Sequence, residues 1–141
     1  MSFITSRSYE IDYKPSDDEY HMWRRKLWPY VEVDRNQLLY FYETPTQCLV
    51  WKTRITEVER FEYNSKSEAR RGLKNFFGYD HEFDSPYFRN APKQGYCLAY
   101  KVEVLGKRLN LEKRPAFRMP RLGWDWIDEK RLRKWFRTYR P

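Results

Sequence analysis

The clearest periodic pattern of apolar and polar residues lies in the middle of the chain. Ser65-Lys66-Ser67-Glu68 has the Ser-x-x-Glu form of a capping box, which marks the start of a helix. Apolar residues follow it at helical spacing, and they are Ala69, Leu73, Phe76 and Phe77. Gly78 then offers a C-terminal stop. The pattern predicts a helix over 65–78 that buries one face.

A similar pattern near the N-terminus predicts a second helix. Ser16-Asp17-Asp18-Glu19 is again a capping box, and apolar residues follow it at three- and four-residue spacing in Tyr20, Trp23 and Leu27. Pro29 has no backbone donor and clashes with the preceding turn, so this helix is expected to run from about 17 to 28. Residues 8–13, just before it, alternate apolar with acidic side chains and predict a half-exposed strand.

A short apolar run followed by turn residues predicts a hairpin. Residues 38–42 are almost entirely apolar, which indicates a central strand, and Thr44-Pro45-Thr46 supplies the turn. The partner strand begins at Cys48. Its apolar positions change parity near Thr56-Glu57, and we expect a bulge there.

A strictly alternating segment lies further along the chain. Residues 96–104 alternate between two sets of side chains and predict a long strand, which Gly106 is expected to turn into a further strand over 108–111. The stretch before it, 79–95, holds two prolines and a glycine among polar residues. It is therefore expected to form a loop.

The last part of the chain is basic. Three arginines and two prolines share residues 114–121, which favours an extended segment over a helix or strand. Asp125 is expected to cap a last helix over 126–140. That helix would place Leu132, Trp135 and Phe136 on one face and its basic residues on the other.

Length and composition are those of one folded α+β domain. We expect a single domain over 1–141 with a basic C-terminal segment over 113–141. The 40% of hydrophobic residues, with 19% aromatic, suffices for a core despite the high content of charge. No apolar stretch is long enough to span a membrane and no signal peptide is recognisable, so a soluble, intracellular protein, cytoplasmic in location, is expected. Cys48 and Cys97 are read as buried, reduced thiols in strands.

The distribution of charge is more informative than the net charge of +8. Residues 1–100 hold 15 basic and 15 acidic residues, whereas residues 101–141 hold 13 basic and 5 acidic ones. The whole excess therefore lies in the last 41 residues. A stretch of one sign beside a neutral body is typical of a surface that binds phosphates, and the alternative is a solvated terminal helix.

Few residues suit catalysis or metal binding. His21 lies in the predicted N-terminal helix and His81 in the predicted loop, so surface roles are favoured for both. Asp80, Glu82 and Asp84 lack the glycine and the distal glutamate of a calcium loop. Nucleotide-binding glycine motifs and zinc motifs are absent. We expect no catalytic residue, no metal and no cofactor.

The aromatic residues supply the candidate site. Rings around a pocket can stack on a nucleobase, and nearby cations can hold its phosphates. Trp124 and Trp126 stand out because they lie on a short segment directly after the arginines. For any one ring, a place in the core is the alternative. Trp28 and Tyr40 belong to the same aromatic set. The predicted nucleic-acid-binding residues are Tyr42, Trp51, Arg114, Arg118, Arg121, Trp124, Trp126, Lys130, Arg133, Lys134 and Arg137.

The order of predicted elements over residues 8–112 resembles the PUA-like superfamily, which includes the PUA, ASCH, EVE and YTH domains. In the EVE-type pattern an apolar strand ends in an aromatic residue followed by a small residue and proline, and the next strand carries an apolar pair and later a valine. The matching residues are Tyr42, Thr44, Leu49, Val50 and Val58. Trp51 stands where that pattern has glycine.

The resemblance implies a mixed β pseudo-barrel flanked by helices, with a pocket that in EVE and YTH relatives reads a modified or flipped base. With the charge distribution, it favours a non-enzymatic domain that binds RNA or DNA. One alternative is a protein-interaction module whose basic amphipathic C-terminal helix docks on an acidic partner through Trp135 and Phe136. Another is a small hydrolase of ASCH-like type that uses lysine or glutamate with tyrosine.

Overall fold

The computed structural model describes residues 1–8, 18–79 and 85–138, and these form two compact units. Unit 1 consists of Met1–Asp17, Arg35–Ile55 and Val102–Pro141. Unit 2 consists of Asp18–Asp34 and Thr56–Lys101. That all 141 residues form one domain stays a prediction.

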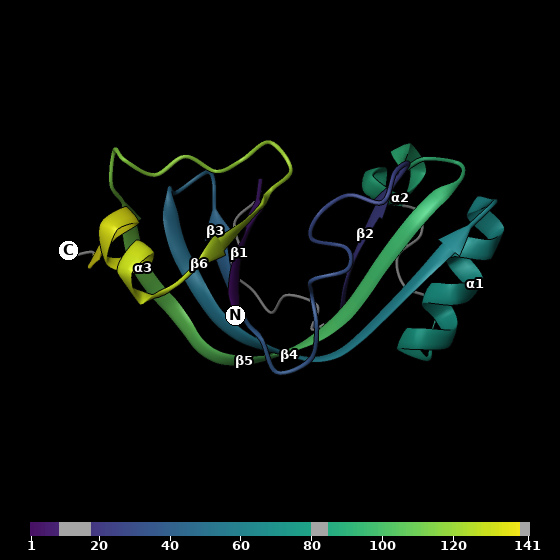
Figure 1. The fold of residues 1–141 in the computed structure, drawn as a ribbon, viewed down its shortest axis with the longest axis horizontal. Coiled ribbons are helices and arrows are strands. Elements are labelled where there is room, and N and C mark those ends of the chain that lie inside the picture. The colour runs from purple at the N-terminus through teal and green to yellow at the C-terminus, as the bar shows by residue number, and fades with distance from the viewer. Residues whose placement is uncertain (9–17, 80–84, 139–141) are drawn as a thin grey trace. The chain divides into compact units, whose positions relative to one another are not determined.

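Among the described residues, seven strands form one mixed sheet in the order β2-β5-β4-β3-β1-β6, with β7 paired to β5 (Figure 1). The strands are β1 Ser2–Arg7, β2 Asp18–Trp23, β3 Leu38–Glu43, β4 Cys48–Tyr63, β5 Gly95–Lys113, β6 Trp124–Ile127 and β7 Phe136–Thr138. The helices are α1 Lys66–Phe77, α2 Pro86–Asn90 and α3 Glu129–Trp135. β1 runs parallel to β3, and β6 runs antiparallel to β1. The expected mixed α+β sheet is confirmed, but it is not closed into a barrel.

The helix predicted over 65–78 is confirmed as α1. The Ser65 hydroxyl accepts a hydrogen bond from the Glu68 N–H at 3.1 Å, and a Glu68 carboxylate oxygen accepts one from the Asn64 N–H at 2.6 Å. At the other end Gly78 takes a φ of 84°, a left-handed conformation that glycine adopts without strain. Its N–H donates to the Lys74 carbonyl oxygen at 2.7 Å.

The helix predicted from 17 to 28 is wrong, because residues 18–23 form strand β2. This strand pairs antiparallel with β5, from Asp18 opposite Lys101 to Trp23 opposite Tyr96. Tyr20 and Met22 contact the core of unit 2 on one face, which is the two-residue period of a strand. Pairing with β5 outweighs the local helical pattern. Residues 9–17, which include most of the strand expected over 8–13, lie outside the described residues.

Strand β5 also differs from the expectation. Gly106 does not turn the chain, and β5 continues to Lys113. Past the glycine, Arg108 and Asn110 take left-handed φ angles of 52° and 49° within the strand. The register of β3 and β4 shifts between Phe41 and Tyr42, and the bulge expected near 56–57 stays a prediction.

The loop expected over 79–95 contains helix α2. The Ser85 hydroxyl accepts a hydrogen bond from the Phe88 N–H at 3.3 Å, and Pro86 occupies the first turn, where its missing N–H costs nothing. Asp80, His81, Glu82 and Asp84 lie outside the described residues. None of the helices in the part of the chain that the structure describes is long and apolar enough to cross a membrane.

Each unit has its own buried cluster. In unit 2, α1 and α2 cover one face of β2 and β5, and the cluster comprises Met22, Tyr63, Ala69, Leu73, Phe77, Phe88, Cys97 and Ala99. In unit 1 it comprises Ile4, Tyr42, Leu49, Phe117, Ile127 and Phe136. Both cysteines are free; Cys97 is buried in β5, and Cys48, at the start of β4, is half-buried. Burial raises the pKa of the Cys97 thiol, so it stays protonated at neutral pH.

Tyr63 makes the stability of the protein sensitive to alkaline pH. Its hydroxyl donates to the Pro92 carbonyl oxygen at 2.9 Å, and burial raises its pKa from 10.0 to about 12. The folded state therefore holds a proton that the unfolded state releases, so this contribution to stability is complete below pH 10 and is lost as pH rises toward 12. We expect Tyr63→Phe to flatten the decline of the free energy of unfolding over this range, measured by urea denaturation. An equally steep decline in the variant would contradict this assignment.

Candidate nucleic-acid interface

The basic segment after β5 is anchored by one ring and leaves its arginines exposed. Phe117 is 1% exposed and packs against Trp135 and Phe136 at ring-centroid distances of 5.2 and 4.9 Å. The Arg114 N–H donates to the Trp135 carbonyl oxygen at 2.6 Å. Arg114, Arg118 and Arg121 are all exposed. Residues 114–121 contain no helix or strand, as predicted, but their course is not extended throughout, because the Phe117 N–H donates to the Arg114 carbonyl oxygen at 3.0 Å and closes a turn.

The helix predicted over 126–140 is wrong in extent. Residues 124–127 form β6, only residues 129–135 form a helix, and residues 136–138 form β7, which pairs with β5. Trp126 and Trp124 lie opposite Phe3 and Thr5 of β1, and this pairing draws both tryptophans into the sheet. Asp128, not Asp125, caps α3, because its carboxylate accepts a hydrogen bond from the Arg131 N–H at 2.8 Å.

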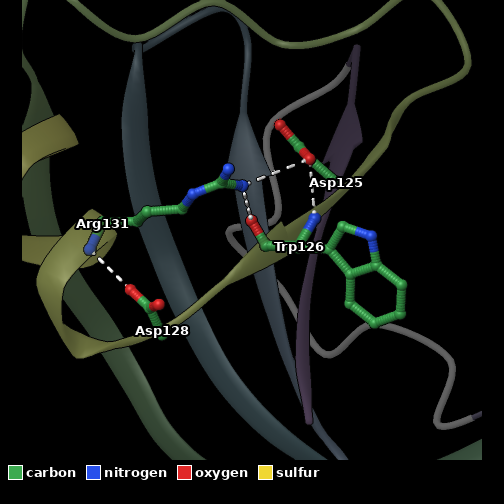
Figure 2. Close-up of polar contacts among 4 residues, drawn as sticks. All are labelled: Asp125, Trp126, Asp128 and Arg131. Carbon is green, nitrogen blue, oxygen red and sulfur yellow. Dashed lines mark hydrogen bonds and ion pairs between the residues drawn. The ribbon is translucent and has the colours of Figure 1, made fainter.

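A polar cluster ties α3 to β6 (Figure 2). The Arg131 guanidinium donates to the Trp126 carbonyl oxygen at 3.1 Å and lies 3.6 Å from the Asp125 carboxylate. That carboxylate also accepts a hydrogen bond from the Trp126 N–H at 2.7 Å, and the guanidinium lies 5.1 Å from the centre of the Trp135 ring. The sequence places Arg131 among the solvated cations of a helix. In the structure it is turned toward the protein and positions α3.

The other predicted cations of α3 and β7 differ in their partners. Arg137 donates to Glu112 at 3.2 Å, a bond that raises the pKa of the guanidinium, and Arg133 lies 3.8 Å from Glu129. Lys130 and Lys134 are exposed, and no carboxylate among the described residues pairs with either. The same holds for the three arginines of the segment before β6. We call these five residues the unpaired cations: Arg114, Arg118, Arg121, Lys130 and Lys134.

The predicted aromatic residues fall on two faces of the sheet of unit 1. The register aligns Phe3 with Trp126 and Phe41 with Trp51, so Trp51, Trp124 and Trp126 share one face. Tyr42 points to the opposite face, where it meets Phe117 edge-on at 5.0 Å. Trp28 belongs to unit 2. The structure therefore brings three of the four predicted rings to one face and separates Tyr42 from them.

Most of these rings are buried. Tyr42, Trp51 and Trp124 are 4%, 5% and 1% exposed. Trp51 packs edge-on against Phe41, and Trp124 packs edge-on against Phe3. Trp126 is half-buried and stacks on Phe3 with ring centroids 4.7 Å apart. Core packing, the alternative for any single ring, therefore describes three of the four.

Groups that a hydrolase would use lie on the same strands. Tyr40 lies opposite Lys52 in the pairing of β3 with β4. Burial, and next the charge of Glu129, raises the pKa of the Tyr40 phenol, so it is a hydrogen-bond donor at neutral pH and not a base. Glu43, buried at the end of β3, accepts a hydrogen bond from the Thr46 hydroxyl at 2.7 Å.

Compared with solved structures, the chain has the fold of an ASCH protein. Three structures of the ASCH protein of Zymomonas mobilis match it. One single-residue mutant has a TM-score of 0.65 at 12% identity, over 94% of this chain and 92% of that one. The unsubstituted protein has a TM-score of 0.57 at 13% identity over the same shares, and a second mutant 0.55 at 11% over 94% of each chain. No family model and no curated protein matches the sequence.

Proposed function

We propose that this protein is a non-enzymatic nucleic-acid-binding domain whose C-terminal segment supplies contacts to phosphates. The observation that carries the proposal is the set of unpaired cations, which share one short stretch of chain from 114 to 134. The positive charge of these cations is not neutralised by a carboxylate of the protein. It is therefore available to phosphate oxygens, which are ligands that arginine and lysine favour.

The arrangement of these cations suits a nucleic-acid backbone better than a single phosphate. Arg114, Arg118 and Arg121 are spread along an irregular segment without helix or strand, and Lys130 and Lys134 are one helical turn apart on α3. Contacts of this kind give affinity without choosing a base. ASCH domains are associated with RNA binding and processing, which favours RNA as the first ligand to test.

Base recognition is the finer part of the proposal. Of the four predicted rings, Trp126 alone is half-buried and so has ring surface to offer a base. Trp51 and Trp124 are buried on the same face of the sheet as Trp126, whereas Tyr42 lies on the opposite face. Arg133 and Arg137 would contribute less than the unpaired cations, because each would have to leave a glutamate.

Charge removal in the basic segment 114–121 tests the proposal. For Arg118→Gln with Arg121→Gln we expect weaker binding to every oligonucleotide and a smaller dependence of log affinity on log salt, by about 0.7–0.9 per lost contact. Fluorescence anisotropy with labelled single- and double-stranded RNA and DNA at several salt concentrations measures both. Arg54→Gln with Lys101→Gln is the matched control, because it removes the same charge from cations already paired with Glu103 and Glu57.

The outcomes separate the candidate functions. If the wild-type protein binds no probe at low salt, the proposal is overturned and a protein partner becomes the better explanation of the basic segment. An equal fall in slope for the control pair would show that net charge, and not this segment, attracts the ligand. Shortening of the labelled probe during incubation, detected on a denaturing gel, would establish the hydrolase alternative.

A further inference from the structure

A second basic surface lies in unit 2, directly after β2. Arg24, Arg25 and Lys26 are consecutive and exposed, and no carboxylate among the described residues pairs with them. Two apolar side chains beside them are also exposed, Leu27 by 39% and Val31 by 59%. The charge count over residues 1–100 hides this cluster, because acidic residues elsewhere in those 100 positions cancel it.

The cluster lies between the end of β2 and an ordered turn over residues 27–33. The Tyr30 N–H donates to the Leu27 carbonyl oxygen at 2.8 Å, and the Val33 N–H donates to that of Pro29 at 3.1 Å. The guanidinium of Arg60, on β4, donates to the carbonyl oxygens of Tyr30 and Val33. Both of those residues are buried, at 6% and 0% exposure. Because β2 precedes residues 24–26 and this turn follows them, the backbone that carries the three cations is held at both ends.

Aromatic side chains accompany these cations. Trp23, the last residue of β2, is half-buried and stacks on His21 with ring centroids 5.5 Å apart and an interplanar angle of 5°. The Lys26 ammonium lies 5.9 Å from the centre of the Tyr30 ring. Cations beside a partly exposed ring are the combination that holds a phosphate and stacks on its base.

We propose that Arg24–Val31, with Trp23, is a second nucleic-acid contact, in which Arg24, Arg25 and Lys26 bind phosphates. This inference rests on the proposed function and extends it, because binding then has two basic contributions, one in each unit. An anionic membrane surface is the other ligand with phosphates. It is less favoured because membrane docking needs a larger exposed apolar surface than Leu27 and Val31 provide. Glu32 and Asp34 are exposed directly after Val31, and these acidic residues mark the end of the basic surface along the chain.

The test compares two charge-matched variants of unit 2. We expect Arg24→Gln, Arg25→Gln, Lys26→Gln to lower the slope of log affinity for RNA against log salt by about 2–3, at roughly 0.7–0.9 per lost contact. The control, Arg70→Gln, Arg71→Gln, Lys74→Gln, removes the same charge from the exposed side of α1 and should leave the slope unchanged. Thermal melting checks that both are folded. If the triple variant is unfolded, Arg24→Gln with Arg25→Gln replaces it, because that pair leaves Lys26 over Tyr30.

Each outcome decides between the two proposals. No binding by the wild-type protein overturns the proposed function and this inference with it. A reduced slope in the Arg118, Arg121 variant with an unchanged slope in the triple variant overturns this inference alone. So does a triple variant that binds RNA normally but no longer sediments with phosphatidylserine vesicles, because the surface would then serve a membrane. If the slope of log affinity against log salt falls equally in the triple variant and in the α1 control, the effect comes from net charge, and this inference is overturned.

Discussion

Replacing Trp124 by alanine is expected to lower the free energy of unfolding by about 3–5 kcal/mol, the usual cost of removing a buried aromatic side chain. Trp124 is 1% exposed, and its ring meets that of Phe3 edge-on with centroids 5.9 Å apart. Phe3 is itself completely buried, so the vacated space cannot fill with water without wetting the core. Urea denaturation followed by circular dichroism measures the loss.

Trp126→Ala is the matched comparison on the same strand. Its ring is half-buried and stacked on Phe3, so truncation should cost less stability than at Trp124. If the Trp126 ring stacks on a base, the substitution should also weaken nucleic-acid binding by about 1–3 kcal/mol. A Trp124→Ala protein of normal stability and reduced affinity would contradict the placement of Trp124 in the core.

Gly95→Ala is expected to destabilise unit 2 by about 3 kcal/mol or more, at the upper end of the cost of overpacking. A Cβ atom at Gly95 would press on the carbonyl oxygen of Trp23 and lie 2.9 Å from its carbonyl carbon. Both contacts are with backbone, so no side-chain rotation relieves them. The end of β2 would have to move away from β5, where Trp23 pairs with Tyr96.

Gly106→Ala controls for the loss of glycine from the same strand. A Cβ atom there would meet the Leu109 side chain at 3.4 Å, an ordinary contact, so we expect a change of less than about 1 kcal/mol. Denaturation midpoints of the two variants, measured side by side, make the comparison. Similar losses of stability in the two variants would contradict this prediction. They would show that the loss of any glycine from β5, and not contact with the Trp23 backbone, causes the destabilisation.

Local patterns predicted the elements that carry their own signals. Helix α1 has a capping box, an apolar face and a C-terminal glycine, and all three agree with the structure. The prediction for residues 18–23 was wrong because two patterns overlap there. Tyr20, Trp23 and Leu27 fit the period of a helix, while Tyr20 and Met22 fit the period of a strand. Only the pairing with β5, almost 80 residues away, decides between them. The turn predicted at Gly106 was wrong for a related reason. A long strand can continue through residues of irregular backbone conformation when it is paired with neighbouring strands.

The exposure of the basic residues was predictable from the sequence, and the burial of the aromatic rings was not. Exposed arginines and lysines are the default, so Arg114, Arg118 and Arg121 are where the sequence places them. Whether a tryptophan is core depends on partners distant in sequence, and Trp124 is buried because β1 brings Phe3 against it. Arg131 could not be separated from its basic neighbours before β6 was known to lie beside α3.

The cluster of Asp125, Trp126 and Arg131 also bears on solubility. Strand β6 ends the strand order on one side, and an edge strand with free backbone groups is a template on which another chain can add a strand. At Trp126 both backbone groups are already engaged, the N–H by Asp125 and the carbonyl by Arg131. An incoming strand would have to displace a charged side chain from each, at a point where a half-buried tryptophan would otherwise invite aggregation. At this point of the edge, Asp125 and Arg131 therefore occupy the two backbone groups with which an added strand would have to pair.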